Sequence, residues 1–115
     1  MTSERVTRLQ GEVYYLPRIA LPEGCTLTVT LNDITAYDAP AITIAVSQTD
    51  VTRQVPLPFE LGYNARLLPQ GRDYELEARI ELQGRLLWIN DTMQRVQPTD
   101  TDQTGLRIQV VQVNG

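Results

Sequence analysis

The most informative feature of this 115-residue sequence is what it lacks: it has no histidine and no lysine, only one cysteine, and ten basic residues that are all arginine. Without histidine there is no imidazole general base, no Ser-His-Asp triad and no histidine metal ligand. Without lysine there is no Schiff-base amine and no phosphate-binding P-loop lysine. A lone cysteine excludes an internal disulfide and a thiolate zinc cluster. We therefore expect no enzyme, no catalytic residue, no cofactor and no metal site.

The charge pattern and the absence of long apolar runs exclude two further classes of protein. The net charge is −4, and the ten arginines are scattered, whereas nucleic acids and anionic membrane surfaces need a basic cluster. No apolar run approaches the ~18 residues of a membrane-spanning helix, and residues 1–5 lack the apolar region of a signal peptide. We expect no nucleic-acid partner and no transmembrane segment in this chain.

The alternation of polar and apolar residues predicts an all-β fold. The length predicts a single domain over residues 1–115, with flexible ends at 1–5 and 114–115. Glycine or proline interrupts the alternation at short intervals, which favours a small antiparallel β-sandwich of about seven strands in two sheets. The expected strands are 6–15, 25–32, 42–46, 55–61, 74–82, 85–89 and 106–113.

Several of these segments carry more specific expectations. The strand at 55–61 contains Pro56 and Pro58, which cannot both belong to a central ladder, so this strand lies at an edge or bridges the two sheets. The strand at 42–46 places its large apolar residues on one face. Gln83 and Gly84 form a two-residue hairpin turn in which the glycine adopts positive φ. The stretch 61–73 is too interrupted for more than a short helical turn.

Cys25 is the one candidate nucleophile or interchain disulfide partner. It stands in an alternating run, on the same face as Leu27, Val29 and Leu31. A free cysteine on a core-facing strand position behaves as a small buried hydrophobe, and this is the interpretation that we favour.

Residues 100–105 resemble the first half of a calcium-binding loop, because Asp100 and Asp102 alternate and Gly105 follows. An EF-hand loop needs a bidentate glutamate twelve positions from its start, where this chain has Val111. We favour a solvated turn over a specific calcium site.

Four acidic residues lie in or next to the predicted strand 74–82: Asp73, Glu75, Glu77 and Glu81. Paired carboxylates hydrolyse glycosides, but the period of two places the three glutamates on one outer face with Arg79 among them. Outward charges usually solvate a sheet, so we favour a structural role.

The aromatic residues leave a ligand-binding function open. Trp88 is either a core residue, which we favour, or a platform that stacks on a sugar or a partner. Tyr14 and Tyr15 must face opposite sides of their strand, so we expect one of them to be exposed on a binding surface.

Taken in order, several segments resemble the YbaY/YscW family of small bacterial lipoproteins, which includes pilotins of type III secretion systems. The resemblance spans roughly residues 9–97 and rests on the segments GEVYY (11–15), RIALPEG (18–24), LTVTLNDI (27–34), DAPA (38–41), QVPLPFEL (54–61), YELEARI (74–80), GRLLW (84–88) and NDT (90–92).

This resemblance implies a β-sandwich in the cell envelope without enzymatic activity. Pilotin members of the family carry a lipidated N-terminal cysteine and bind a segment of an outer-membrane secretin. In this sequence no such cysteine stands before residue 11, and Cys25 lies inside a predicted strand. If a signal peptide and lipobox precede Met1, we expect a periplasmic or outer-membrane-anchored protein, which can be lipid-anchored at full length. If the chain starts at Met1, we expect a cytoplasmic one.

We therefore expect a non-catalytic binding or assembly module of the bacterial envelope, with a protein partner and possible pilotin-like activity toward a secretin. The partner would bind to an exposed sheet face or add a strand at the edge that is not protected by proline. The first alternative is a β-sandwich that binds carbohydrate or another small ligand, which requires an exposed Trp88 or a tyrosine cluster. The second is an enzyme that uses surface carboxylates.

Overall fold

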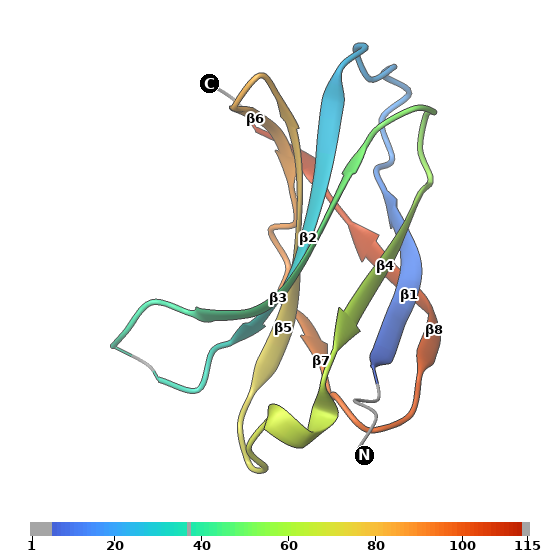
Figure 1. Ribbon diagram of the computed structural model, residues 1–115. Coiled ribbons are helices and arrows are strands. Elements are labelled where there is room, and N and C mark those ends of the chain that lie inside the picture. Colours follow the sequence, from blue (N-terminus) through green and yellow to red (C-terminus); the bar gives the residue numbers. More distant parts are fainter. Residues whose placement is uncertain (1–5, 37, 114–115) are drawn as a thin grey trace.

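The computed structural model describes residues 6–36 and 38–113, so the predicted flexible ends at 1–5 and 114–115 lie outside the described residues. The described residues form two β-sheets packed face to face (Figure 1). Their strands are β1 (Thr7–Tyr14), β2 (Cys25–Asp33), β3 (Ile42–Asp50), β4 (Leu57–Tyr63), β5 (Tyr74–Leu82), β6 (Arg85–Ile89), β7 (Gln94–Val96), β8 (Gln103–Gln109) and β9 (Val111–Gln112). This arrangement confirms the predicted all-β sandwich.

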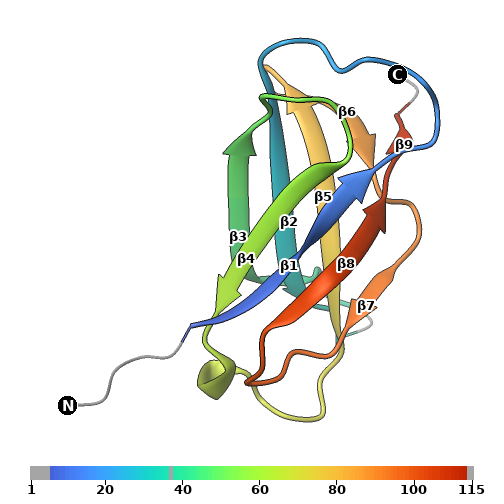
Figure 2. The same ribbon diagram turned by 90° about the vertical axis from the view of Figure 1, so that its right-hand side faces the viewer.

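The smaller sheet has the strand order β4-β1-β8, and the larger one has the order β3-β2-β5-β6-β9, with β7 pairing with β5 (Figure 2). One pair departs from the antiparallel prediction, because β1 and β8 run parallel. All the other strand pairs of the described residues are antiparallel.

The prediction of a single last strand at 106–113 is wrong. Its residues belong to β8 in the small sheet and β9 in the large one, and the chain passes between the sheets at Val110, whose N–H donates to Tyr14 O at 2.9 Å. This crossing joins the two sheets along one side of the sandwich. On the opposite side, β3 and β4 are the outermost strands of their sheets.

The core lies between the sheets and draws on the inward-facing positions of both. Residues that are fully buried come from β1, β2, β4, β5 and β8, namely Leu9, Val13, Val29, Leu31, Leu61, Leu76, Ala78, Ile80 and Ile108. Each large side chain withdrawn from water in this way contributes about 1.5–3 kcal/mol to folding. One continuous core therefore holds both sheets together.

The predicted strand at 55–61 starts two residues later than expected, at Leu57, and contains Pro58 but not Pro56. It occupies the predicted edge position. β4 is the outer strand of the small sheet, and Pro58 lies in it opposite Glu12 of β1. Proline has no N–H to offer a further strand, so this edge is protected against strand addition. The hairpin turn is also confirmed, since Gly84 has φ +80°.

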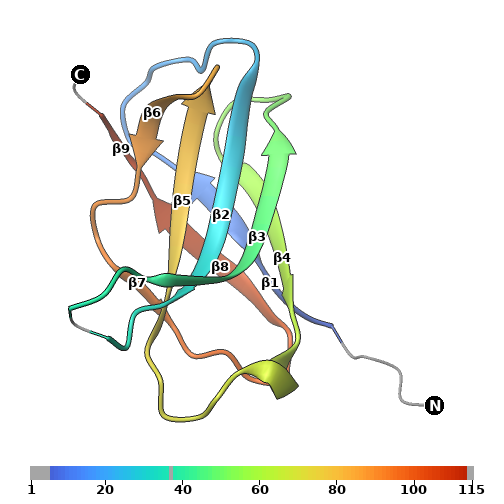
Figure 3. The same cartoon turned by 60° about the vertical axis from the view of Figure 1, so that its left-hand side comes forward.

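β3 is the strand whose surroundings the sequence pattern least anticipated. The prediction that its large apolar residues share one face is wrong: Val46 pairs with Thr30 on the outer face, whereas Ile44 packs against the core. Val46 and Ile42, which pairs with Asp33, are each 58% exposed. A β-bulge shifts the register between Leu31 and Asn32 of β2. Beyond it the β2–β3 hairpin projects away from the sheet (Figure 3).

The sequence pattern missed one short element, β7, and gave only an approximate position for another, the helical turn η1. β7 has three residues, too few to show a period. β6 and β7 both pair with β5, and the Asn90 side chain bonds to β5 between these two pairings. It accepts from Ala78 N at 2.9 Å and donates to Leu76 O at 3.3 Å. A 3-10 helix, η1 (Ala65–Leu67), is the short turn expected between 61 and 73.

Candidate protein-binding surfaces

Cys25 faces the core at the start of β2 and is 1% exposed. Burial raises the pKa of its thiol, so the reactive thiolate is disfavoured. Cys25 is therefore a packed apolar residue, as we favoured from the sequence, and not an accessible nucleophile.

The acidic residues of β5 form an outer charged row. Arg79 lies between Glu77 and Glu81, with nitrogen–oxygen distances of 3.9 and 3.8 Å, and Asp73 lies 3.9 Å from Arg95. These are partly exposed ion pairs of the kind that contributes little to stability. They do not bring two carboxylates together in an apolar pocket, which acid–base catalysis by such groups requires.

The loop of Asp100 and Asp102 is held by hydrogen bonds of its own. Asp102 Oδ1 accepts from Arg8 N at 2.9 Å, and Thr101 N donates to Thr99 Oγ1 at 3.1 Å. Among residues 6–36 and 38–113, no three histidine, cysteine, aspartate or glutamate side chains gather as a metal site would require. The arrangement is that of the solvated turn.

Trp88 is a core residue, 3% exposed, and its ring stacks on Tyr15 with centroids 3.7 Å apart and planes 7° from parallel. An exposed Trp88, one of the two features that the carbohydrate-binding alternative predicts, is therefore excluded. Of the two neighbouring tyrosines, Tyr15 is the buried one. Tyr14 faces outward but is half-buried, because the Arg107 guanidinium lies 4.2 Å from its ring centroid.

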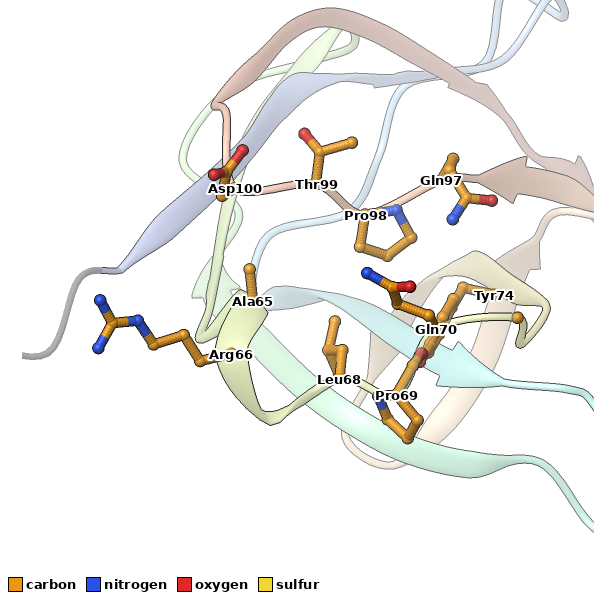
Figure 4. Close-up of a pocket in the computed structure, with 11 residues that line it drawn as sticks. Ala65, Arg66, Leu68, Pro69, Gln70, Tyr74, Gln97, Pro98, Thr99 and Asp100 are labelled. Atoms are coloured by element: carbon orange, nitrogen blue, oxygen red, sulfur yellow. The ribbon is translucent and has the colours of Figure 1, made fainter.

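A hollow lies at one end of the sandwich, and we call it the end cleft (Figure 4). It has a volume of about 620 Å³ and lies between the segment 65–71, Tyr74 and the segment 97–100. Figure 4 shows Pro98 facing Gln70 across the cleft, with Leu68 and Pro69 beside it and Arg66 extending away. These residues belong to the loops before β5 and after β7.

The polar groups at the end cleft are engaged in fixing its walls. Tyr74 OH donates to Pro69 O at 3.2 Å, and Tyr63 OH accepts from Thr99 N at 3.0 Å. Burial raises the pKa of Tyr74 and that of Tyr63, so both hydroxyls stay neutral near pH 7. The end cleft can receive an apolar side chain beside Leu68 and Pro98.

A buried ion pair fixes the place where the β2–β3 hairpin leaves the sheet. Asp33 is 6% exposed and accepts from Thr35 Oγ1 at 2.6 Å, from Thr35 N at 3.0 Å and from Arg72 Nε. Hydrogen bonds from Thr35 and Arg72 lower the pKa of this carboxyl to about 2, although its burial opposes the shift. Asp73 N donates to Thr35 Oγ1 at 2.9 Å, which ties the hairpin to the chain entering β5.

The second candidate surface is the outer edge of the large sheet, which we call the β3 edge and define as residues 42–50. In the part of the chain that the structure describes, β3 pairs with β2 on one side and with no strand on the other. Residues 42–49 contain no charge and no proline, and Asp50 is its first charged residue. A long uncharged edge strand with exposed apolar residues is a typical site of strand addition.

Comparison with known proteins assigns the family. Residues 4–110 match the family described as "Type III secretion system lipoprotein chaperone (YscW)". The chain belongs to the YscW family. This confirms the resemblance found in the sequence and extends it past residue 97, through β8.

Two relatives are informative. The uncharacterized lipoprotein YbaY of Escherichia coli K12 is 33% identical over 89 residues, which are 76% of this chain and 47% of that protein. The chain thus spans about half the length of this curated relative. An alternative pilotin from the type II secretion system of Vibrio cholerae has a solved structure that is 35% identical, with a TM-score of 0.85, covering 96% of this chain and 99% of that one.

Sequence reasoning recognised the core cysteine, the outer carboxylates and the protected edge, but neither candidate surface. The end cleft joins segments about thirty residues apart that carry no shared motif. The β3 edge did have a signal, since a strand with three large apolar residues and almost no charge was evident. The pattern could not say which face lies outward.

Among the residues that the structure describes, no helix has the length and apolar character that crossing a membrane requires.

Proposed function

We propose that this YscW-family protein is a pilotin-like chaperone: it binds a segment of an outer-membrane secretin subunit and promotes the assembly of that subunit. The observation that carries the proposal is the similarity to a type II secretion pilotin over 96% of this chain and 99% of that one, at 35% identity. Because a shared fold alone does not fix a function, the proposal rests on the sequence identity together with the shared fold.

The side chains of the described residues support a role in binding over one in catalysis. Cys25 and Trp88 are buried, and the β5 carboxylates pair with Arg79 on an outer face. Protein recognition needs accessible apolar surface, which is present at the end cleft and at the β3 edge. We propose that the protein acts at the bacterial envelope, held there by a lipid anchor, as its lipoprotein relative would be.

Deletion of the gene in the source organism tests this function. We expect the amount of assembled secretin multimer in the outer-membrane fraction to fall at least fivefold, and the wild-type gene to restore it. Cys25→Ala is the matched control, and we expect it to restore assembly as well, because Cys25 is buried and cannot carry the anchor. Normal secretin assembly in the deletion strain would contradict the proposal.

A further inference from the structure

We infer that the β3 edge binds an extended segment of a protein partner as an additional strand of the large sheet. The inference rests on the proposed function only in taking the partner to be a protein; it adds the place and the conformation in which the partner segment is held. The segment would carry bulky apolar side chains at alternate positions and no charge over about six residues, the length of the straight part of β3.

Comparison of the five outer strands selects β3. β4 contains Pro58, and β8 contains Arg107 and Gly105, the latter with φ +72°, which interrupts a regular ladder. β7 has three residues and β9 has two, too few to support a further strand. β3 has nine residues and carries its first charge at Asp50, so it lacks the usual protection of an edge.

The direction of the unpaired backbone groups follows from the ladder with β2. Val51 N donates to Cys25 O at 2.9 Å, and the register from Thr26–Asp50 to Leu31–Ala45 continues without a shift. Because an antiparallel ladder alternates, the N–H and C=O groups of Val46, Gln48 and Asp50 point away from β2. Three successive donor–acceptor pairs are thus presented at the straight part of the edge.

One row of outer side chains becomes less polar toward this edge, whereas the next two rows end at Gln48 and Asp50. In the row that becomes less polar, Glu77 of β5 lies beside Thr30 of β2, and Thr30 lies beside Val46 of β3. Val46 is 58% exposed, although it is the apolar end of the row. An added strand with apolar outward side chains would cover Val46 without bringing a charge next to it.

The inner side of the edge indicates the size of the partner side chains. The inward residues Ala45, Ser47 and Thr49 are small, and a hollow of about 560 Å³ lies beside them. It is lined by Ser47 and Thr49 and, on the side of the small sheet, by Gln10, Gly11, Pro58, Phe59 and Glu60. Bulky side chains of an added strand would fill this hollow. A second copy of β3 would offer only the same small residues, so a segment of a different protein fits better than self-association.

The experiment uses a defined probe, so that it is independent of the secretin test. A nine-residue peptide that alternates isoleucine and threonine, with a lysine at each end, is titrated into the ¹⁵N-labelled protein. We expect the amide signals of Val46, Gln48 and Asp50 to shift and their hydrogen exchange to slow. A peptide of the same composition with a central proline is the negative control.

Gln48→Pro removes one outward N–H and leaves the ladder with β2 intact, and we expect at least tenfold weaker peptide binding. Gln48→Ala truncates the same side chain but keeps the N–H, and we expect binding within twofold of wild type. Gln70→Arg fills the end cleft and should leave peptide binding unchanged.

Three results would overturn the inference. The first is no binding by the wild-type protein at millimolar peptide. The second is equal binding by Gln48→Pro and Gln48→Ala, or loss of binding in Gln70→Arg. The third is a wild-type dimer in sedimentation that Gln48→Pro dissociates, which would make a second copy the occupant. None of these results bears on secretin assembly, so the failure of one proposal is distinct from the failure of the other.

Discussion

At the scale of single residues, polar side chains hold several loops in place. Asp33, together with Thr35 and Arg72, fastens the base of the β2–β3 hairpin. In the same way Gln54 brackets the backbone of Leu21, accepting from its N–H at 2.7 Å and donating to its carbonyl at 3.2 Å. These side chains position exposed segments and take no part in chemistry, which agrees with a surface that recognises a partner.

The lowered pKa of Asp33 gives a prediction about pH. Its folded-state pKa is about 2, below the ordinary value of 3.8, so the ionised form stabilises the fold. This stabilisation is complete above about pH 4 to 5 and is lost as the pH falls through the folded-state pKa. We expect Asp33→Asn to lower the free energy of unfolding by about 1–2 kcal/mol at pH 7.

Urea unfolding at pH 7 and at pH 2.5 checks this prediction. The difference between wild type and Asp33→Asn should shrink at the lower pH, because wild-type Asp33 is then partly protonated. Asp73→Asn is the control, since the Asp73 carboxylate is exposed and lies 3.9 Å from Arg95, and we expect its effect to stay below about 0.5 kcal/mol. An Asp33→Asn effect that is the same at both pH values would contradict the assigned role.

At the scale of elements, the parallel pairing of β1 and β8 depends on a glycine. Gly11 lies opposite Leu106 where the register of the two strands shifts, and a Cβ at Gly11 would lie 1.9 Å from the Leu106 carbonyl oxygen. Backbone cannot move aside as a side chain does, so any larger residue would force the strands apart. β8 can therefore pair with β1 only because Gly11 has no Cβ.

We expect Gly11→Ala to destabilise the protein by about 3 kcal/mol, because overpacking against backbone is not relieved by a rotamer change. Gly62→Ala is the matched control within β4, where the nearest atom to the added Cβ is Cγ1 of the exposed Val6 at 2.9 Å. That side chain can rotate, so we expect a loss below about 1 kcal/mol. Thermal unfolding of the two variants measures the difference, and equal losses would show that β8 adjusts freely.

At the scale of the whole molecule, the two sheets share one core and should unfold together. Trp88 and Cys25 of the large sheet and Leu9 and Ile108 of the small sheet belong to one buried hydrophobic cluster. A domain of this size unfolds as one cooperative unit, with an enthalpy of about 80 kcal/mol by the usual value per residue.

We expect the urea midpoints measured by Trp88 fluorescence, by far-ultraviolet circular dichroism and by Cys25 labelling to coincide, because no probe can be exposed without opening the common core. Cys25 should react with a thiol reagent at the rate of global unfolding in native buffer. Labelling of Cys25 at a lower urea concentration than the loss of Trp88 fluorescence would instead show that one sheet opens alone, and the single-domain prediction would then be wrong.

The sequence by itself determined the fold class and excluded the mechanisms that need histidine or lysine. The alternation in β2 and β5 specified buried faces because side chains alternate across a strand, and the missing histidine and lysine removed whole classes of mechanism. Pro58 was enough to place β4 at an edge, since a residue without an N–H cannot occupy a central ladder.

Only the tertiary structure decided which face of β3 is outward, where the last strand changes sheet, and which loops meet at the end cleft. A period of two predicts that Ile42 and Val46 lie on one side of their strand, but the bulge breaks that period, so that Val46 pairs with Thr30 and Ile42 with Asp33 on opposite faces. That depends on pairing with β2, a non-local choice made by the common core of the sandwich. The candidate binding surfaces arise from such pairings, and no local pattern encodes them.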